Sequence, residues 1–303
     1  MTEAYIWQQG RVCSFHQAQL NPFNFTTMYG FGVFEGIRTY QTANGRYGFR
    51  VDSHIERLFK SAEMLKMLLM FNEKDVLNAI TELLSHTSQP NLYIRPMITA
   101  DSHGFLGIKA PSVSYQLTIA AIAWSFSASK QKQQQGLNMQ LSNMRKPPPE
   151  CANLKAKSCG NYLKTIIALN EIKSTEIDDL LFCDHQGFIV EASGANVFCI
   201  NDNCLYYPET DCALEGITQD TIIALAKQLQ IPVKSKKLSL DTVVNADEVF
   251  ISGTATEVMA VTTINGNPIG TGQQGKVTEQ LYNQYHDLVT GNNNQFSEWL
   301  MKI

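Results

Sequence analysis

The sequence predicts a mixed α/β (α+β) protein with two domains and a cleft between them. Its 303 residues suit one large or two medium domains and are sufficient for a sizeable buried core. Apolar residues at helical spacing occur together with short segments rich in Ile, Tyr and Thr, which favour strands. A polar stretch of small residues and glutamines near residue 130 separates the two halves. Clefts between domains commonly bind ligands.

The first part of the chain mixes helices and strands. Apolar side chains recur at helical spacing over residues 55–69 and again over residues 76–84, which predicts two amphipathic helices. Residues 92–99 and 114–124 are rich in Ile, Tyr and Thr and are predicted as strands.

Two breaks follow these elements. Residues 128–136 consist mainly of Gln, Lys and Ser and are predicted as a linker between an N-terminal domain (1–127) and a C-terminal domain (137–303). Further on, Lys146 is followed by Pro147, Pro148 and Pro149. Three prolines remove three backbone donors, so this segment can be neither helix nor central strand.

The second part alternates between helices and short strands. Helices are predicted at 161–172, from Gly216 or Thr218 to Leu229, and at 277–289. Strands are predicted at 179–183, 188–191, 197–200, 205–207 and 247–252. Turn residues such as Asp184–Gly187 separate these strands. We expect the ordered part to end near Gly291, where three asparagines follow.

Bulk properties exclude several classes of function. The net charge of −4 and the pI near 5.9 argue against nucleic-acid binding. No apolar run approaches the roughly 18 to 20 residues of a membrane span, and the N-terminus lacks the pattern of a signal peptide. The seven cysteines form no C-x-x-C pair, and the six histidines have no ligand-like spacing. We therefore expect a cytoplasmic protein with reduced thiols and no metal site.

Lys157 is the most informative single residue. A lysine amine becomes a nucleophile when its charge is suppressed, and it can then form a Schiff base with an aldehyde cofactor. Lys155 and Lys164 are within reach of the same position and remain alternatives on these grounds. A solvated surface lysine is the ordinary role of any of the three.

Three further features suit a charged ligand. Gly216–Thr218 precedes a predicted helix, whose free N–H groups and dipole make an anion site, although a threonine cap explains the same residues. Tyr93 and Arg95 lie two apart on one predicted strand, so both point to one face and suit a carboxylate; a structural ion pair is the alternative. Glu191 ends an otherwise apolar strand and is a candidate partner for a cationic group. A charge that discourages pairing with another strand edge is the alternative.

Six motifs occur in a characteristic order along the chain. They are Tyr29-Gly30-Phe31-Gly32-Val33-Phe34-Glu35-Gly36-Ile37-Arg38, Tyr93-Ile94-Arg95-Pro96, Lys157 followed by Asn161-Tyr162-Leu163, Glu191-Ala192-Ser193-Gly194-Ala195-Asn196, Gly216-Ile217-Thr218 and Ser252-Gly253-Thr254-Ala255. From about Ala4 to about Gly291, the chain resembles the class IV pyridoxal-phosphate aminotransferases, and most of all the branched-chain amino acid aminotransferases. The resemblance implies fold type IV, with a small N-terminal domain, a larger C-terminal domain, a cofactor cleft between them, and a homodimer or higher homo-oligomer.

The resemblance also implies a pyridoxal 5'-phosphate cofactor. Lys157 would hold its aldehyde as a Schiff base and later move a proton, and the spacing to Tyr162 selects it over the two other lysines. Glu191 would pair with the pyridine nitrogen, and Tyr162 would lie beside the ring. The phosphate would be bound by Arg57, Gly216, Ile217, Thr218 and Thr254.

The implied reaction moves an amino group between leucine, isoleucine or valine and 2-oxoglutarate. Tyr93 and backbone N–H groups at Thr254 and Ala255 would hold the α-carboxylate, and Arg95 would receive the distal carboxylate of glutamate. The other residues that match the substrate pocket are Tyr29, Phe34, Arg38 and Trp124.

Three residues depart from the family pattern. Many relatives carry Glu, Tyr and Arg where this chain has Ala195, Ser127 and Gln219. These departures keep two alternatives on the same fold, 4-amino-4-deoxychorismate lyase and D-amino acid aminotransferase. A non-catalytic dimer with a vestigial cofactor site is a third, although the candidate lysine and carboxylate are both present.

Overall fold

The computed structural model describes residues 4–124, 132–133, 135–293 and 295–303. The chain forms two units. Unit 1 comprises Met1–Ser125, Ala156–Tyr162 and Val289–Ile303, and unit 2 comprises Phe126–Lys155 and Leu163–Leu288. Two segments far along the chain therefore belong with the first 125 residues, which a division by sequence position does not anticipate. Most of the predicted linker, at 128–131 and 134, lies outside the described residues.

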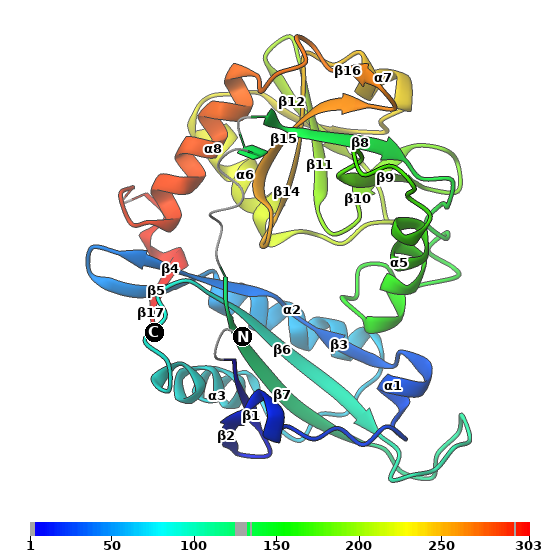
Figure 1. Cartoon of the computed structure of the whole chain (residues 1–303), viewed down its shortest axis with the longest axis vertical. Coiled ribbons are helices and arrows are strands. Elements are labelled where there is room, and N and C mark those ends of the chain that lie inside the picture. The colour runs from blue at the N-terminus through cyan, green and yellow to red at the C-terminus, as the bar shows by residue number, and fades with distance from the viewer. Residues whose placement is uncertain (1–3, 125–131, 134, 294) are drawn as a thin grey trace. The chain divides into compact units, whose positions relative to one another are not determined.

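The described part of unit 1 is built on an eight-stranded antiparallel sheet (Figure 1). Its order is β17-β5-β4-β6-β7-β1-β2, and β3 pairs with β6. The strands are β1 (Tyr5–Gln8), β2 (Arg11–Ser14), β3 (Gly32–Phe34), β4 (Ile37–Thr42), β5 (Gly45–Phe49), β6 (Leu92–Asp101), β7 (Ser114–Ala123) and β17 (Leu300–Lys302). The two strands predicted in this region are confirmed as β6 and β7, which pair from Leu92↔Ala123 to Asp101↔Ser114.

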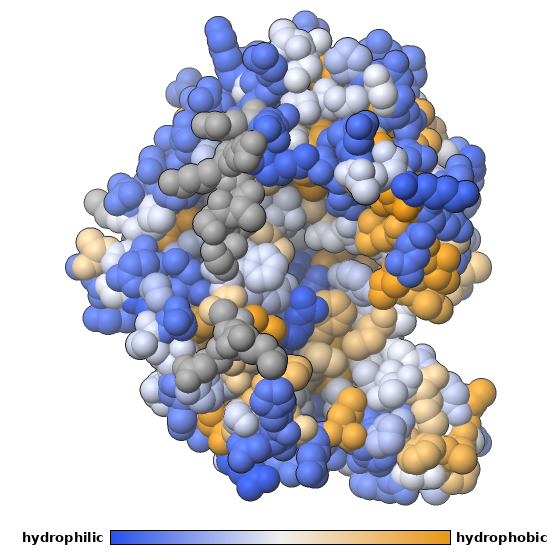
Figure 2. Space-filling model, viewed as in Figure 1, coloured by the Kyte–Doolittle hydropathy of each residue, from blue (hydrophilic) through white to orange (hydrophobic). Residues whose placement is uncertain are grey.

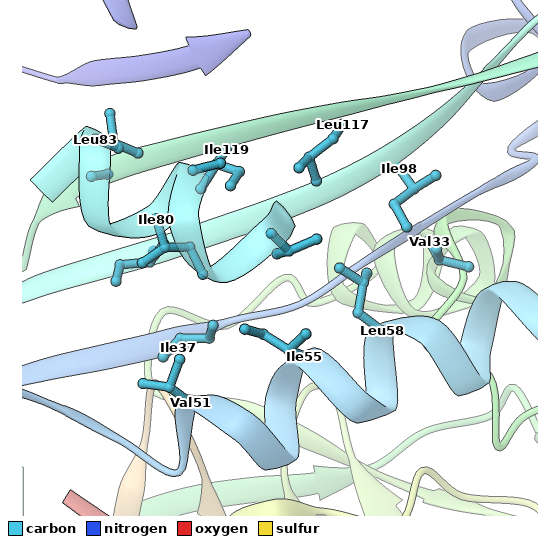
Figure 3. Packing of buried hydrophobic residues seen from close by; sticks show 14 of the residues in the cluster. Val33, Ile37, Val51, Ile55, Leu58, Ile80, Leu83, Ile98, Leu117 and Ile119 are labelled. Atoms are coloured by element: carbon cyan, nitrogen blue, oxygen red, sulfur yellow. The ribbon is translucent and has the colours of Figure 1, made fainter. Parts of the chain in front are cut away.

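Two helices, α2 (Val51–Met64) and α3 (Glu73–Ser85), pack on this sheet. Figure 3 shows Ile55 and Leu58 of α2 and Ile80 of α3 turned toward Ile98 and Ile119 of the sheet. Burying these side chains contributes roughly 1.5–3 kcal/mol each. A short helix, α1 (Phe25–Tyr29), precedes β3.

The prediction of one helix over 55–69 is wrong at its end. Helix α2 stops at Met64, and Lys66 adopts a left-handed conformation with φ 59°. Leu68 continues the apolar spacing, but it is 83% exposed. The apolar residues after Met64 therefore belong to a loop, where spacing carries no information about the helix.

The expectation that order ends near Gly291 is also wrong. Residues Leu300–Lys302 form β17, which pairs antiparallel with β5, and Met301 packs against the unit 1 core. The backbone N–H of Arg50 also donates to the Trp299 carbonyl at 2.7 Å. A three-residue strand is too short for any alternation of polar and apolar residues to reveal it.

Unit 2 contains a nine-stranded sheet in its described part. Its order is β10-β9-β8-β15-β14-β11-β12-β13, and the ninth strand, β16, pairs with β15. A further pairing of β10 with β11 closes the first six strands into a ring. The strands are β8 (Leu137–Leu141), β9 (Asp179–Cys183), β10 (Ile189–Ala192), β11 (Asn196–Asn201), β12 (Cys204–Pro208), β13 (Val233–Lys236), β14 (Glu248–Gly253), β15 (Glu257–Ile264) and β16 (Asn267–Pro268). Val197, Ile251 and Val261 belong to the buried apolar cluster of this sheet.

Three helices of unit 2 are close to their predicted positions, namely α5 (Leu163–Asn170), α6 (Ile217–Gln228) and α8 (Lys276–Val289). A fourth, α7 (Leu240–Val244), was not predicted. The helix predicted at 161–172 is shorter, since Cys159–Tyr162 forms a 3-10 turn before it. Strand β9 coincides with its predicted range, and β14 is displaced by one residue.

Candidate functional site

The segment that carries Lys157 is attached to three elements of unit 1. The Phe34 N–H of β3 donates to the Lys157 carbonyl at 3.1 Å, and the Lys157 N–H donates to Ser61 Oγ of α2 at 3.0 Å. The Gly160 N–H donates to the Gly30 carbonyl at the end of α1. Gly30 has φ 70°, and a Cβ there would lie 3.0 Å from Gly160 Cα, so this close approach requires glycine.

The Lys157 amine lies among aromatic side chains. Its Nζ donates to the Tyr162 hydroxyl at 2.9 Å and lies 5.0 Å from the centre of the Phe34 ring. The Phe34 and Tyr162 rings are 5.1 Å apart. Burial lowers the pKa of Lys157, because a charged amine is poorly solvated there. A larger fraction of neutral, nucleophilic amine follows.

The two rival lysines have different surroundings. Lys155 pairs with Asp211 at 2.8 Å and Glu215 at 3.3 Å, and the hydrogen bond to Asp211 raises its pKa. Lys164 is exposed on α5. The raised pKa keeps the Lys155 amine protonated, so this structure favours Lys157 over Lys155 as the candidate nucleophile.

A buried carboxylate, Glu35, lies at the turn between β3 and β4. Its Oε1 accepts from Arg57 Nε at 2.5 Å, and its Oε2 accepts from Arg57 Nη2 and the Gly36 N–H, both at 3.0 Å. His54 Nδ1 lies 2.7 Å from the same Oε2. Burial alone would raise the pKa of Glu35, but Arg57 and His54 hold it far below its ordinary value.

Helix α2 supplies most of these partners from one face. His54, Arg57 and Ser61 follow one another at spacings of three and four, which places them on one side of a helix. His54 is buried, and burial lowers its pKa, so it is neutral near pH 7. The face therefore orients a guanidinium and supports the Lys157 backbone.

Tyr93 and Arg95 lie on one face of β6, as their spacing predicts. Arg95 Nη2 donates to the Tyr93 hydroxyl at 3.1 Å, and the Arg95 guanidinium lies 4.7 Å from the Phe34 ring. The Trp124 ring lies 5.2 Å from that of Tyr93, and its buried Nε1 has no hydrogen-bond partner among the described residues. Arg38 is opposite Tyr93 in the β4–β6 register. These donors make a surface suited to an anionic group.

Tyr29 is the candidate that lies apart from the others. Its side chain is half exposed, its hydroxyl donates to the Leu106 carbonyl at 2.6 Å, and its ring packs on Phe25. None of the described hydrogen bonds or ring contacts joins it to Lys157. Ser127, one of the departures from the family pattern, is outside the described residues.

In unit 2, Glu191 of β10 is paired with a lysine that the sequence does not suggest. Lys146 Nζ lies 2.6 Å from Glu191 Oε1, and both side chains are largely buried. Glu191 Oε2 accepts from the Leu214 N–H at 3.4 Å. The carboxylate is thus held on both oxygens.

A row of polar side chains continues from Glu191 across the sheet. Glu191 is opposite Asn196, and Asn196 is opposite Ser252, so the three side chains share one face. Asn196 donates to the Leu214 carbonyl at 2.9 Å. The Ser252 hydroxyl is fully buried and has no hydrogen-bond partner among the described residues.

This row reaches the N-terminus of α6. Gly216 precedes the helix, and a Cβ there would lie only 1.9 Å from Asn196 Oδ1, so the backbone can approach the row only as glycine. Ile217 and Thr218 form the first turn, where backbone N–H groups and the helix dipole favour an anion. Gln219 accepts from the Gly216 N–H at 3.4 Å.

Thr254 and Ala255 occupy the turn that follows β14, two and three residues beyond Ser252. Both are half-buried. Ala195, another departure from the family pattern, is buried against the unit 2 core. Its methyl group supplies packing where a carboxylate would have to be desolvated.

Unit 1 therefore contains a buried amine with a lowered pKa, the guanidinium groups of Arg38, Arg57 and Arg95 and several aromatic rings, and unit 2 contains the largely buried Glu191 carboxylate and the N-terminus of α6. Among the described residues, no group of three or more His, Cys, Asp or Glu side chains could hold a metal ion. Nor does the described part of the chain contain a helix that is long and apolar enough to cross a membrane.

Sequence reasoning assigned no role to several of these residues. They are Glu35, His54, Ser61, Lys146, Asn196 and Ser252. Glu35, Asn196 and Ser252 lie inside the motifs, so their position in the sequence indicates that they belong near the site. Lys146 gave none, because a lysine beside three prolines in a polar segment is ordinarily exposed.

Comparison with known proteins shows the family of the chain. The profile of the family described as "Amino-transferase class IV" matches residues 32–264. The chain belongs to the class IV aminotransferases. Within that class it belongs to the family of the branched-chain-amino-acid aminotransferases, since it is 34% identical to that protein from Pseudomonas aeruginosa over 98% of this chain and 96% of the relative.

Solved structures give the same result for the fold. A branched-chain amino acid aminotransferase with pyridoxamine 5'-phosphate has a TM-score of 0.95 and 32% identity, with 99% of each chain covered. The branched-chain amino acid aminotransferase from Escherichia coli has a TM-score of 0.92 at 31% identity, over 100% of this chain and 99% of the other. The fold-type IV architecture implied by the motifs is confirmed.

Proposed function

We propose that this protein is a pyridoxal-phosphate-dependent aminotransferase that moves amino groups between branched-chain L-amino acids and 2-oxoglutarate. The observation that carries the proposal is the Lys157 amine, whose pKa is lowered by burial and which is held beside Tyr162 and Phe34 in a chain of this family. Relatives that bear the branched-chain name cover nearly the whole chain. The lyase and the D-amino acid enzyme receive no comparable support.

The residues present fit the cofactor. When bound, pyridoxal phosphate supplies an amine-reactive aldehyde and a ring that withdraws electrons from the substrate. Lys157 would hold the aldehyde carbon and move a proton at its Nζ, and Glu191 would hold the ring nitrogen. The unpartnered Ser252 hydroxyl is opposite Asn196, whose side chain lies against Gly216, and this supports an anion near the start of α6.

We propose roles in cofactor binding for residues of each unit, because the cofactor needs an amine, a partner for its ring nitrogen and a site for its phosphate. Unit 1 contributes Lys157, Arg57 and Tyr162, and unit 2 contributes Glu191, Gly216, Ile217, Thr218 and Thr254. Arg57 binds the phosphate in this proposal. Its two hydrogen bonds to Glu35 fix the direction of the guanidinium before the phosphate arrives, which lowers the entropy lost on binding.

For the substrate, we propose that Tyr93 and the backbone N–H groups of Thr254 and Ala255 hold the α-carboxylate. Arg95 receives the distal carboxylate of glutamate, and its hydrogen bond to Tyr93 keeps a polar partner beside it when an apolar side chain is bound. Phe34 and Trp124 supply apolar walls. Tyr29 and Arg38 complete the substrate residues in this proposal.

We further propose a cytoplasmic homo-oligomer. Leu163, Ile166 and Ile167 on α5 are 63%, 54% and 41% exposed, and Figure 2 shows apolar residues gathered over this helix. Contiguous exposed apolar surface commonly marks an interface between proteins. All seven cysteines are free thiols, as expected for a reducing compartment. Sedimentation of the purified protein as a monomer would contradict the oligomer.

A substrate panel tests the activity. Purified protein with pyridoxal phosphate and 2-oxoglutarate is given L-leucine, L-isoleucine, L-valine, their D-enantiomers, D-alanine and aminodeoxychorismate, and glutamate is measured. Glutamate should form with the three branched-chain L-amino acids. Turnover confined to D-alanine, or release of pyruvate from aminodeoxychorismate alone, would overturn the assignment in favour of one of the two alternatives.

A further inference from the structure

Lys146 is a buried lysine without an assigned role. The residue is only 8% exposed, its Nζ lies 2.6 Å from Glu191 Oε1, and the same Nζ lies 5.0 Å from the centre of the Phe182 ring. A buried ammonium group is unfavourable unless it is paired, so this side chain is kept in place by its carboxylate partner. The Lys146–Glu191 pair therefore behaves as a unit.

The backbone around Lys146 is fixed as well. Its N–H donates to the Cys183 carbonyl at the end of β9, at 2.8 Å. Pro147, Pro148 and Pro149 follow at once, and each restricts φ to a narrow range. The three prolines have no reactive side chains. They restrict the backbone next to Lys146, where this side chain enters the core of unit 2.

Glu191 is constrained from the other side by the polar row. Its Oε2 accepts from the Leu214 N–H at 3.4 Å, and the Leu214 carbonyl accepts from Asn196 Nδ2 at 2.9 Å. The carboxylate therefore cannot rotate without breaking a contact with either Lys146 or Leu214. The Lys146 ammonium group on Oε1 also partly neutralises the carboxylate. Glu191 therefore attracts a second cation less strongly than it would without Lys146.

We propose that Lys146 is a positioning residue for the cofactor ring: it holds Glu191 through Oε1 and shares its charge, so that Glu191 binds the ring nitrogen in a fixed direction and with moderated strength. This inference rests on the proposed function, in which Glu191 is the partner of the pyridine nitrogen. Two cations that share one carboxylate are coupled. Removal of Lys146 must therefore change how much more tightly the protein binds a cofactor with a protonated ring nitrogen than one without it.

The test compares two cofactors in the wild type and in Lys146→Met. One is pyridoxal phosphate, and the other is its analogue with carbon in place of the ring nitrogen. Both carry the same aldehyde and phosphate, so contacts with those groups cancel in the ratio of the two dissociation constants. We expect Lys146→Met to raise the preference for pyridoxal phosphate about tenfold, in line with one strengthened charge-assisted hydrogen bond.

Thermal unfolding supplies a second readout. Without Lys146, the cofactor-free protein contains an unpaired buried carboxylate, and only a cofactor with a ring nitrogen can pair it. Pyridoxal phosphate should therefore raise the Tm of Lys146→Met more than that of the wild type, and the carbon analogue should not. Equal Tm increases from both cofactors in this variant would overturn the proposal.

Matched variants separate positioning from general stability. Lys146→Arg keeps the charge and should retain the wild-type ratio within about twofold, since Arg and Lys both donate to a carboxylate. Lys132→Met removes another ion pair of unit 2, with Asp178 at 2.7 Å, and should leave the ratio unchanged. Lys146→Met/Glu191→Gln avoids the unpaired charge if the single variant does not fold. Its ratio should equal that of Glu191→Gln.

The outcomes distinguish the two proposals. If the wild type binds no pyridoxal phosphate, the proposed function fails before the role of Lys146 is tested. If the wild type binds it and transaminates leucine, but Lys146→Met has the wild-type ratio, Lys146 is only structural and this inference is overturned.

Discussion

The two units hold their carboxylates in different ways. In unit 1, Glu35 has no exposed surface and is surrounded by side chains of α2, with Arg57 on both oxygens and His54 on one. In unit 2, Glu191 is held by one lysine and one backbone N–H. The unit 1 group is complete without a ligand, whereas the unit 2 row still contains the unpartnered Ser252 hydroxyl.

This difference separates stability from binding. Groups that already satisfy one another contribute to the folded state, and their loss leaves buried charge behind. A buried hydroxyl without a partner is unfavourable in the folded state until a ligand supplies one. Substitutions in the Glu35 group should therefore act on stability, whereas removal of the Ser252 hydroxyl should act mainly on binding.

Lys157→Ala is expected to have the largest effect on activity. It removes both the amine that holds the cofactor and the group that moves the proton, so turnover should fall by at least roughly a thousandfold. The measurement is leucine-dependent glutamate formation, with Lys155→Ala as the control. Because Lys155 faces Asp211 and Glu215, its variant should remain active. Loss of activity in the control alone would mean that the wrong lysine was chosen.

Glu35→Gln should have the largest effect on stability. The substitution leaves the Arg57 charge without its carboxylate, and breaking a buried pair in this way costs about 3–5 kcal/mol. Urea unfolding of the cofactor-free protein measures the change. Glu56→Gln on the same helix is the control, since its pair with Lys60 is largely exposed and contributes about 0–1 kcal/mol. Similar losses in both variants would show that the buried Glu35 pair contributes no more to stability than an exposed pair does.

Acid should destabilise unit 1 in two stages. Burial lowers the pKa of His54 below its ordinary 6.5, so below that pH the unfolded chain binds a proton that the folded chain does not. Burial alone would raise the pKa of Glu35, but its partners hold it below its ordinary 4.5. Below pH 4.5 the unfolded chain therefore again binds a proton that the folded chain does not, and stability falls. Stability should therefore fall as pH falls through 6.5 and more steeply below 4.5.

Unfolding midpoints in urea between pH 8 and pH 4 test this expectation. His54→Gln lacks the titrating imidazole, so its stability should change less with pH between roughly 6.5 and 4.5 than that of the wild type. A wild-type midpoint that does not change over this interval would show that His54 titrates alike in both states.

Much of this arrangement follows from the sequence, for reasons that differ between residues. Strand β9 is predictable because an apolar run from Leu180 to Cys183 is followed by the turn residues Asp184–Gly187. The face shared by Tyr93 and Arg95 follows from the two-residue period of a strand. The choice of Lys157 rests on its spacing to Tyr162 in the family motif, which can be seen directly in the sequence.

The remainder depends on partners that are distant in the chain. Burial of Lys146 makes sense only beside Glu191, and β17 forms only because β5 offers an open edge. Glu35 lies in a motif, but its role depends on α2 presenting Arg57 and His54 from one face. Pairings of this kind are set by tertiary packing, which periodicity and local propensity do not reveal.

Arg95→Met tests the substrate side of unit 1. The glutamate half-reaction loses a charge-assisted pair and should slow by at least ~2 kcal/mol of transition-state stabilisation, which is roughly thirtyfold. The leucine half-reaction should change much less, because its side chain carries no charge. Stopped-flow spectra measure the two half-reactions separately. Equal losses in both would mean that Arg95 supports the site generally or binds the α-carboxylate.

Ser252→Ala should have the smallest effect of these variants. The sign of its effect on the stability of the cofactor-free protein distinguishes the unit 2 row from the Glu35 group most clearly. The hydroxyl is buried without a partner among the described residues, so its removal should leave the cofactor-free protein as stable as the wild type or slightly more stable. Affinity for pyridoxal phosphate should nevertheless fall about fivefold, since one neutral hydrogen bond is worth roughly 0.5–1.5 kcal/mol.

Urea unfolding and cofactor titration on the same Ser252→Ala preparation measure both quantities, with Thr221→Ser on α6 as a nearby control. Thr221 donates its hydroxyl to the Ile217 carbonyl, and serine retains that donor, so cofactor affinity should not change. Lower stability with unchanged affinity in Ser252→Ala would place its hydroxyl among groups that serve the fold, as Glu35 does. The contrast between the Glu35 group, whose members already satisfy one another, and a polar row with a hydroxyl available to a ligand would then be lost.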